Sequence, residues 1–437
     1  MSPIIASVLL AQSSAPATLP PTGGEAKVAV VREVEALYPT LATLYLDLHG
    51  SPELSFQEVK TSGKLAERLR TLGFEITAGV GKTGVVAVLR NGAGPTVLVR
   101  TDLDALPVEE KTGLPYASHA TGTSPSGETV PVMHACGHDA HMTSWVGTAT
   151  VLARLRNRWH GTLVMLAQPA EEIGQGARTM LADGLFARFG RPDFALAFHV
   201  MPDQPVGTVG IRPGPLFASA DSVDLRFFGV GGHGALPNKT VDPIVIAARF
   251  VLAVQTLVSR ENDPFEPAVV TVGSIHGGTK HNIIPDEVRL QLTVRATSDA
   301  NRKRLLAGIE RIARAEAEAG NAPRPPEVVV SQGLPPVVND QALSARIAGA
   351  LRSGLGAEHV VEARQVMVSE DFALLGQAGV PALLMLLGTS DPQALAEAQR
   401  TGTPLPALHS PLFAPVVEPT LKTGVTAMTL AALELLR

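Results

Sequence analysis

The chain has almost no cysteine that could stabilise it covalently and no long apolar run that could hold it in a membrane. It contains one cysteine in 437 residues, so an intramolecular disulfide is excluded. No run of about 18 apolar residues occurs, which argues against a membrane-spanning helix and against a membrane partner. Because 45% of the residues are hydrophobic and 18% are charged, the composition predicts a large folded core in about two or three domains.

Basic charge is scarce as well. The net charge is −5, the isoelectric point is near 6.2, and the Lys and Arg residues are scattered along the chain. A nucleic-acid-binding protein usually presents a basic face, so we expect no nucleic-acid partner. The G-x-S-x-G pentapeptide of many serine hydrolases is also missing. A serine hydrolase of that kind is therefore disfavoured.

Residues 1–26 read as a leader that does not belong to the fold. The stretch "PIIASVLLA" resembles the apolar part of a signal peptide, and "SSAPA" offers small residues for cleavage. No Lys or Arg precedes the apolar run, however, as a signal peptide usually requires. The sequence leaves two alternatives open, a periplasmic or secreted protein with a cleaved signal or a cytoplasmic protein with a disordered leader.

From residue 27 helical and strand patterns alternate. The apolar spacing predicts helices over 30–49, 55–73, 140–157 and 419–437, and strands at 84–90, 95–102, 161–168, 193–199 and 381–388. The first two strands are expected to be neighbours. The strands are almost continuously apolar, which is typical of a sheet covered on both faces. We therefore expect an α/β catalytic domain with a mostly parallel sheet flanked by helices, formed by residues 27–216 and 333–437.

The order of the predicted helices and strands changes between residues 217 and 332. Strand, helix, two strands, helix and strand follow one another, which is the β-α-β-β-α-β order of a ferredoxin-like fold. This segment is expected to be a smaller inserted domain that acts as a lid or as a dimerisation domain.

Polar residues follow three of the predicted strands of the larger domain. Asp102 and Asp104 end one strand, Glu171 and Glu172 follow another, and His199 closes a third. In open α/β sheets ligands bind beyond the carboxyl ends of the strands. These residues are therefore expected to line a functional site.

The single cysteine lies in the stretch "MHACGHDAH". Cys136 and His138 are two residues apart, and in an extended loop this spacing would point both side chains the same way. A thiolate and an imidazole that converge suit a metal such as zinc. The alternative is a buried cysteine beside a core histidine, but Asp139 and His141 in the same turn favour the metal. Asp139 alone would also suit the first turn of a helix.

Glu171 and Glu172 are adjacent, so in regular structure they face different ways. One could bind metal while the other faces a water molecule, although an acidic surface loop has the same sequence. Four further residues are individually uninformative, since His199 and His409 could be structural histidines and His233 and Asn282 could be turn residues.

Together these stretches resemble the two-metal amidohydrolases of the hippurate hydrolase and indole-acetyl-amino-acid hydrolase type, which are kin of the aminoacylases and zinc carboxypeptidases. The resemblance is carried by eight motifs in family order, "DLHGSPELSFQE", "RTDLDALP", "MHACGHDAH", "QPAEE", "GGHGALPNKTVDP", "HNIIPDE", "SEDF" and "HSPLF". The chain departs from the family pattern at Asn238, where a histidine is usual, in the long segment 119–131, and around His199. These departures leave the choice of substrate open.

The resemblance implies a role for each candidate residue. The metal ligands would be Cys136, His138, Glu172, His199 and His409. Glu171 would be the general base, and Asp104 would orient a ligand or the bridging water. His233 and Asn282 would polarise the substrate carbonyl, with the histidine supplied by the other subunit of a homodimer formed through the inserted domain.

The sequence thus predicts a metal-dependent amidohydrolase that cleaves N-acyl amino acids, such as hippurate-like, N-acetyl or aryl-acyl conjugates. Two divalent ions, zinc or else manganese, cobalt or nickel, would activate the attacking water. A carboxypeptidase or dipeptidase with the same site is the first alternative, and a metal-binding protein without turnover is the second. The second alternative is disfavoured because a structural site needs no free base beside its ligands.

Overall fold

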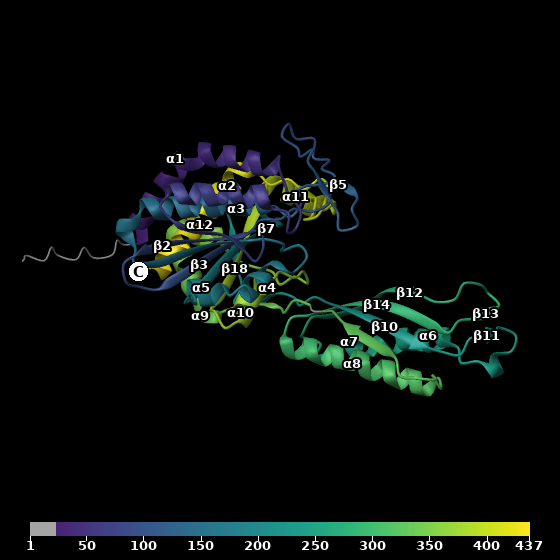
Figure 1. Cartoon of the computed structure of the whole chain (residues 1–437). Coiled ribbons are helices and arrows are strands. Elements are labelled where there is room, and N and C mark those ends of the chain that lie inside the picture. The colour runs from purple at the N-terminus through teal and green to yellow at the C-terminus, as the bar shows by residue number, and fades with distance from the viewer. Residues whose placement is uncertain (1–22, 332) are drawn as a thin grey trace, which may run out of the picture.

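A mainly parallel eight-stranded sheet forms the centre of the larger domain (Figure 1). The computed structural model describes residues 23–331 and 333–437. In spatial order the strands are β1 Glu75–Val80, β2 Gly84–Asn91, β6 Gly161–Gln168, β3 Thr96–Asp102, β7 Phe194–Pro205, β18 Ala382–Ser390, β8 Val209–Ile211 and β17 Val360–Glu362. Neighbours from β6 to β18 run parallel, as do β8 and β17, whereas β1–β2, β2–β6 and β18–β8 are antiparallel.

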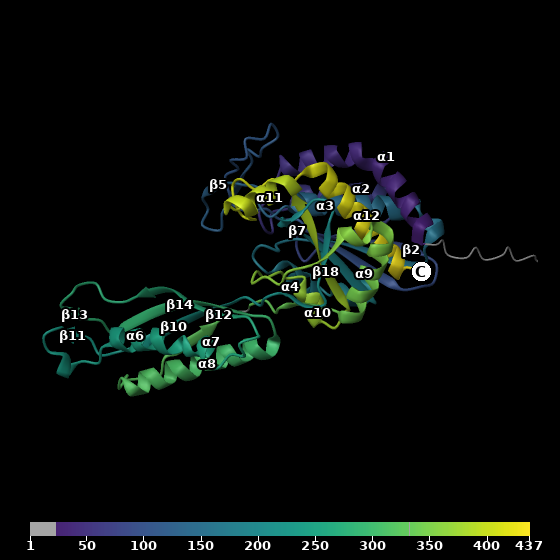
Figure 2. The ribbon, with the colours of Figure 1, turned by 180° about the vertical axis from the view of Figure 1, so that it is seen from behind.

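Helices cover both faces of this sheet, as the apolar strands predicted (Figure 2). One face packs against α1 Gly23–His49, α2 Val59–Thr71, α3 His138–Arg154, α9 Gln341–Leu355 and α12 Val417–Leu435. The other packs against α4 Gly176–Ala182, α5 Leu185–Phe189 and α10 Ala373–Gln377. Within β6, Leu163 and Met165 join the first core and Val164 and Leu166 the second. The predicted α/β fold class is confirmed.

The expectation that strands 84–90 and 95–102 are neighbours is wrong. β6 lies between β2 and β3 and pairs with both. The short connection between β2 and β3 passes the start of β6, where Thr162 N–H donates to the Pro95 carbonyl. A Cβ at Gly161 would lie 2.2 Å from the Pro95 oxygen, so this crossing requires glycine. A pairing partner that lies far away in the sequence cannot be read from the local pattern.

The inserted segment forms an arm with its own core and the predicted β-α-β-β-α-β order. Its elements are β10 Asp221–Phe228, α6 Pro243–Val254, α7 Thr256–Ser259, β12 Ala268–His276, β14 Glu287–Ala296, α8 Asp299–Ala319 and β15 Glu327–Val330. The sheet has the order β12-β14-β10-β15 and is antiparallel throughout. A small ribbon of β11 Gly232–His233 and β13 Ile283–Ile284 lies at the end of the arm away from the larger domain (Figure 1).

The remaining short elements lie outside both main sheets. Segment 119–131 contains a hairpin, and a second strand pair adjoins the base of the arm, where Ala220 and Leu334 form a bridge. These elements are β4 Thr121–Thr123, β5 Thr129–Pro131, β9 Gly214–Phe217, β16 Val337–Asn339, α11 Pro392–Thr401 and the 3₁₀ helices Arg156–Arg158, Pro237–Lys239 and Ala357–His359.

The N-terminal predictions are left largely untested. Residues 1–22 lie outside the described residues, so the signal peptide and the disordered leader both stay predictions. Helix α1 begins at Gly23, earlier than the pattern from Val30 indicated, and Ala26 is buried, so the end of the predicted leader 1–26 belongs to the fold. Among the described helices, none combines the length and the apolar character needed to cross a bilayer.

Candidate metal centre and active site

The carboxyl ends of β6, β3 and β7 lie side by side, because these three strands are parallel neighbours. The polar residues that follow or end β3 and β6 therefore reach one edge of the sheet. His199 arrives there differently from the prediction. It does not close β7, which continues to Pro205, but lies within the strand and is 7% exposed.

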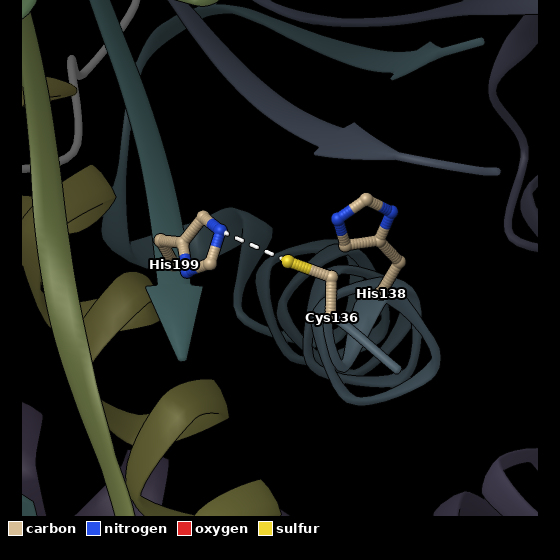
Figure 3. Close-up of side chains that lie close together, drawn as sticks. All are labelled: Cys136, His138 and His199. Atoms are coloured by element: carbon tan, nitrogen blue, oxygen red, sulfur yellow. Dashed lines mark hydrogen bonds between the residues drawn. The ribbon is translucent and has the colours of Figure 1, made fainter. Parts of the chain in front are cut away.

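The Cys136 turn is not the extended loop that its spacing suggested. Gly137 adopts the left-handed conformation with φ 75°, and α3 begins at the next residue, His138. A Cβ at Gly137 would lie 2.6 Å from Cγ2 of Val200 in β7, so glycine lets the turn approach that strand. This turn brings Cys136 Sγ to 3.6 Å from His199 Nε2 (Figure 3). Cys136, His138 and His199 form one group whose ligand atoms lie within 4.8 Å of one another.

Two histidines present the same nitrogen to this group. His138 Nδ1 donates to the Asp104 carbonyl oxygen at 2.7 Å, and His199 Nδ1 donates to the Val200 carbonyl oxygen at 2.8 Å. With Nδ1 protonated, the lone pair of a neutral imidazole lies on Nε2. Both Nε2 atoms are therefore free to bind a metal, and a backbone oxygen fixes each ring as second partners of metal ligands commonly do.

A second group shares the cysteine. Cys136, Glu172 and His409 also bring their ligand atoms within 4.8 Å of one another, and His409 Nε2 lies 3.5 Å from a Glu172 oxygen. His409 comes from a distant loop, where it has φ 65° and its backbone N–H donates to Ala135 O at 2.9 Å. The five predicted ligands thus meet at one place, and Cys136 Sγ belongs to both groups.

The electrostatics of this cluster fit a cation. Burial and the carboxylates of Glu172 and Glu171 raise the pKa of the Cys136 thiol. Burial disfavours a charge on His138, yet Asp102 and Glu172 raise its pKa to about 9. His138 Nε2 and Glu172 Oε1 are buried, lie 3.8 Å apart, and have no hydrogen-bond partner among the described residues. Two unsatisfied ligand atoms, one nitrogen and one oxygen, beside a buried sulfur are what a zinc-like ion would satisfy.

Glu171 and Glu172 diverge from adjacent backbone positions. The Glu172 carboxylate lies close to His409 and Cys136. The Glu171 carboxylate lies in a different buried group, with Glu370 and Asp371. Burial and the negative charges of Glu370 and Glu172 raise the pKa of Glu171 well above its ordinary value. A carboxylate in such surroundings accepts a proton readily.

Asp104 contacts the backbone of these two glutamates. Its Oδ1 accepts the N–H of Glu171 at 3.0 Å, and its Oδ2 accepts the N–H of Glu172 at 3.1 Å and the Ser55 hydroxyl at 2.6 Å. Asp104 is fully buried. It can therefore orient Glu171 and Glu172 through their main chain, and it also supplies the carbonyl oxygen that holds His138.

His233 and Asn282 lie far from this cluster within the chain. His233 is in β11 and Asn282 directly precedes β13 at the tip of the arm, where the Gly234 N–H donates to the Asn282 carbonyl oxygen at 2.9 Å (Figure 1). Neither is among the described residues that line the metal-side cleft. His233 is exposed, and its Nδ1 accepts the Ala235 N–H at 3.0 Å, so that its Nε2 carries the donor hydrogen in the neutral ring.

A buried charge network beneath the site was missed by the sequence reasoning. Arg100 donates to Asp102 at 2.8 Å, to Glu370 at 2.8 Å and to Asp371 at 3.1 Å. Asp102 in turn accepts from His141 Nδ1 at 2.8 Å, while His141 Nε2 accepts the Val200 N–H at 2.8 Å. His141 is thus fully hydrogen-bonded and is not free to bind metal. An arginine inside an apolar strand was the available signal.

Arg295 was also missed. It lines a cleft of about 580 Å³ that includes Cys136, Glu171, Glu172, His199 and His409. Arg295 lies on β14 of the arm and donates to Ser369 Oγ in the larger domain at 3.3 Å. In the sequence it is one of several polar residues on the open face of an alternating strand, so no local signal separated it from the others.

A buried thiol, imidazoles and carboxylates at the strand ends of an α/β domain, with a further carboxylate beside them, define a metal-dependent hydrolase. The chain belongs to the peptidase family M20/M25/M40, whose model matches residues 98–402. This assignment confirms the resemblance drawn from the motifs. It also favours an enzyme that acts on amide bonds over a metal-binding protein without turnover.

Individual relatives agree with this assignment. The chain is 38% identical to the N-acetylcysteine deacetylase of Bacillus subtilis over 82% of its own length and 90% of the relative. It is 37% identical to the hippurate hydrolase of Campylobacter jejuni over 74% and 82% of the two chains. Among solved structures, a dinuclear metal-binding peptidase of the M20 family from Bacillus subtilis aligns with a TM-score of 0.76 at 32% identity, covering 92% of this chain and 99% of that one.

Proposed function

We propose that the protein hydrolyses the amide bond of N-acyl amino acids. The observation that carries this proposal is Glu171, a buried carboxylate of raised pKa beside the ligand cluster, in a cleft that also contains the Arg295 guanidinium. A base beside metal ligands supports hydrolysis, and a cation in the same cleft supports a substrate with a free carboxylate. The names of the deacetylase and hippurate hydrolase relatives agree with this substrate class.

Cys136, His138, Glu172, His199 and His409 would hold two divalent ions, because they form two candidate ligand groups that have Cys136 in common. Bound there, the ions would lower the pKa of water and polarise the substrate carbonyl. Sulfur and imidazole ligands favour zinc, while manganese, cobalt and nickel are the alternatives.

Glu171 would move the proton during the reaction. Its carboxylate would accept a proton from the attacking water and pass it to the leaving amine nitrogen, which must be protonated to depart. Asp104 supports this role because it accepts the backbone N–H groups of Glu171 and Glu172 and so limits their movement. The low exposure of Glu171, 8%, keeps bulk water from competing for its proton.

Arg295 would bind the substrate carboxylate. Guanidinium groups recognise carboxylates through charge-assisted hydrogen bonds. Apolar side chains also line the cleft, among them Phe217, Leu334 and Val366, and they would accommodate the acyl group.

The oxyanion donors would come from a second copy of the chain. His233 and Asn282 lie at the tip of the arm, and the exposed Nε2–H of His233 has the donor character that a developing oxyanion needs. In a twofold homodimer formed through the arms, His233 of the partner subunit would enter the metal cleft. The inserted segment 217–332 would thus be both lid and dimerisation domain.

A hydrolysis screen tests the proposal. N-acetyl, N-benzoyl and indole-acetyl amino acids, dipeptides and longer peptides are incubated with protein loaded with Zn²⁺, Mn²⁺, Co²⁺ or Ni²⁺. Release of the free amino acid from the N-acyl substrates, abolished by chelator, is expected. Cleavage of peptides alone would favour the carboxypeptidase or dipeptidase alternative and would contradict the proposal.

A further inference from the structure

The backbone N–H groups of Ala170, Glu171 and Glu172 all donate hydrogen bonds to two buried carboxylates. Glu58 Oε1 accepts the Ala170 N–H at 2.8 Å. Asp104 accepts the next two, from Glu171 at 3.0 Å and from Glu172 at 3.1 Å. Asp104 follows β3. Glu58 directly precedes α2 and is the last residue of the motif "DLHGSPELSFQE".

Glu58 is itself held firmly. Its Oε1 also accepts the Phe56 N–H at 2.8 Å, and its Oε2 accepts the Thr83 hydroxyl at 2.6 Å. The residue is 0% exposed. A buried carboxylate with hydrogen-bond partners on both oxygens acts as a rigid anchor. Rotation of its side chain would break those hydrogen bonds, and replacing them with bonds to water would cost free energy.

The anchored residue has an unfavourable backbone conformation. Ala170 has φ 50°, which lies in the left-handed region that residues other than glycine rarely adopt. Such a conformation persists where surrounding contacts enforce it. The Ala170 carbonyl oxygen accepts from Gln175 and Gly176 at 3.2 and 3.1 Å, so Glu58 on the N–H side completes the restraint. The left-handed turn determines the directions in which Glu171 and Glu172 leave the chain.

We propose that Glu58 is a positioning residue that maintains this turn and thereby aims Glu171 as base and Glu172 as metal ligand. Glu58 acts through Ala170 and does not line the cleft among the described residues. The inference rests on the proposed function for the role of Glu171, but its consequence for Glu172 can be measured without any substrate.

Glu58→Ala removes the anchor and leaves the Ala170 N–H without its acceptor. Misplacing a reacting group by about 1 Å can cost about 100-fold, so kcat should fall by about 10–100-fold while KM stays nearly unchanged. The affinity for Mn²⁺, measured by titration calorimetry with the metal alone, should fall by about 10–100-fold, as is typical when a group that orients a ligand is lost.

Two further variants separate positioning from general stability. Glu58→Gln keeps an oxygen for the Phe56 and Ala170 N–H groups and an amide that can donate to Thr83, so it should restore most of both losses. Glu53→Ala is the matched control, because Glu53 lies in the same motif and accepts the Lys60 and Thr61 N–H groups at the start of α2 without touching residues 170–172. It should lower thermal stability and leave kcat and Mn²⁺ affinity near their wild-type values.

The outcomes are distinct. A folded Glu58→Ala variant with wild-type kcat and Mn²⁺ affinity would overturn the proposal, as would equal losses in Glu58→Ala, Glu58→Gln and Glu53→Ala. If Glu58→Ala does not fold, Thr83→Val tests the same anchor. It should lower kcat and Mn²⁺ affinity, and wild-type values of both would overturn the proposal. If wild-type protein cleaves none of the N-acyl substrates, the proposed function fails, while the Mn²⁺ titrations still decide the role of Glu58.

Discussion

The proposed active site has two halves, the strand-end cluster and the tip of the arm, and they are built differently. At the strand ends Cys136, His138 and His199 are buried, and backbone carbonyl oxygens fix both histidine rings, that of Asp104 from a separate segment for His138 and that of the neighbouring Val200 for His199. At the tip, His233 is exposed and its ring is held by the local Ala235 N–H. The difference indicates that the strand-end half is pre-organised within one chain, whereas the proposed role of the tip half requires a second chain to place it.

The largest expected effect comes from removing the proposed general base of the strand-end half, Glu171. Glu171→Gln is nearly isosteric but cannot accept the proton of water, so kcat should fall by about 10⁴-fold or more, the upper end for general acid–base catalysis that serves both steps. The fold and the amount of bound metal should not change. Steady-state kinetics and elemental analysis measure both, and retention of one-tenth of wild-type kcat, on the order of 10³-fold above the expected value, would show that Glu171 is not the base.

Cys136→Ser tests the ligands of the same half. A hydroxyl is a harder and far less acidic ligand than a thiol, so Zn²⁺ affinity should fall by about 100-fold and the preference should shift toward Mn²⁺. Competition titrations with both ions measure the shift. Superimposable curves for wild type and variant would place Cys136 outside the metal shell.

The tip half is tested by mixing two inactive proteins. His233→Ala should lower kcat by about 100-fold, as for loss of an oxyanion donor. After subunit exchange with Glu171→Gln, mixed dimers would contain one site with both residues intact, and about a quarter of wild-type activity should return. Mixed dimers that form and stay inactive would contradict supply of the histidine by the partner.

Arg295 sharpens the comparison because it belongs to the arm yet lines the strand-end cleft. Arg295→Ala should raise KM by about 10–100-fold for N-acyl amino acids, the range expected for a hydrogen bond to a charged group. The corresponding N-acyl amino amides lack the carboxylate and should show little change in KM. An equal rise in KM for both series would remove the carboxylate-binding role.

The smallest expected effect is on the free energy of unfolding and involves His49, which contacts Asp139 in the first turn of α3. His49 lies between Asp139 and Glu110, at 2.7 and 3.1 Å, and although burial disfavours its charge, these carboxylates raise its pKa to about 9. A raised pKa stabilises the fold fully below the unfolded value of about 6.5, and this contribution disappears as the pH rises through 9. It amounts to up to about 3 kcal/mol.

His49→Gln should therefore destabilise the protein more at pH 6 than at pH 9.5. Chemical denaturation of wild type and variant at both values, with the same metal content, measures the difference. A destabilisation that is equal at the two pH values would contradict the charged His49.

Much of the strand-end half could be predicted from the sequence, because its signals are local. Apolar runs followed at once by Asp104 or by Glu171 and Glu172 indicated both the strands and the edge at which they end. The insertion was visible for the same reason, since its strand and helix periods alternate in a recognisable order. Such patterns depend on neighbours within a few residues, and the sequence displays them directly.

The rest depends on contacts between distant segments. The left-handed Gly137 turn is set by its approach to Val200, and the position of His199 within β7 follows from a strand longer than its apolar run. Glu58 reaches Ala170 across 112 positions, and Arg295 meets Ser369 across 74. No periodicity reports such pairs, so residues that position the site were harder to find than residues that form it.

The central claim is that one strand-end site holds two metal ions around the Cys136 sulfur. The most direct measurement is anomalous diffraction from crystals grown with Zn²⁺ or Mn²⁺, with data collected on both sides of the metal absorption edge. The account predicts two peaks per chain, both adjoining Cys136 Sγ, one beside His138 and His199 and the other beside Glu172 and His409. A single peak, or peaks that do not contact Cys136, would contradict it.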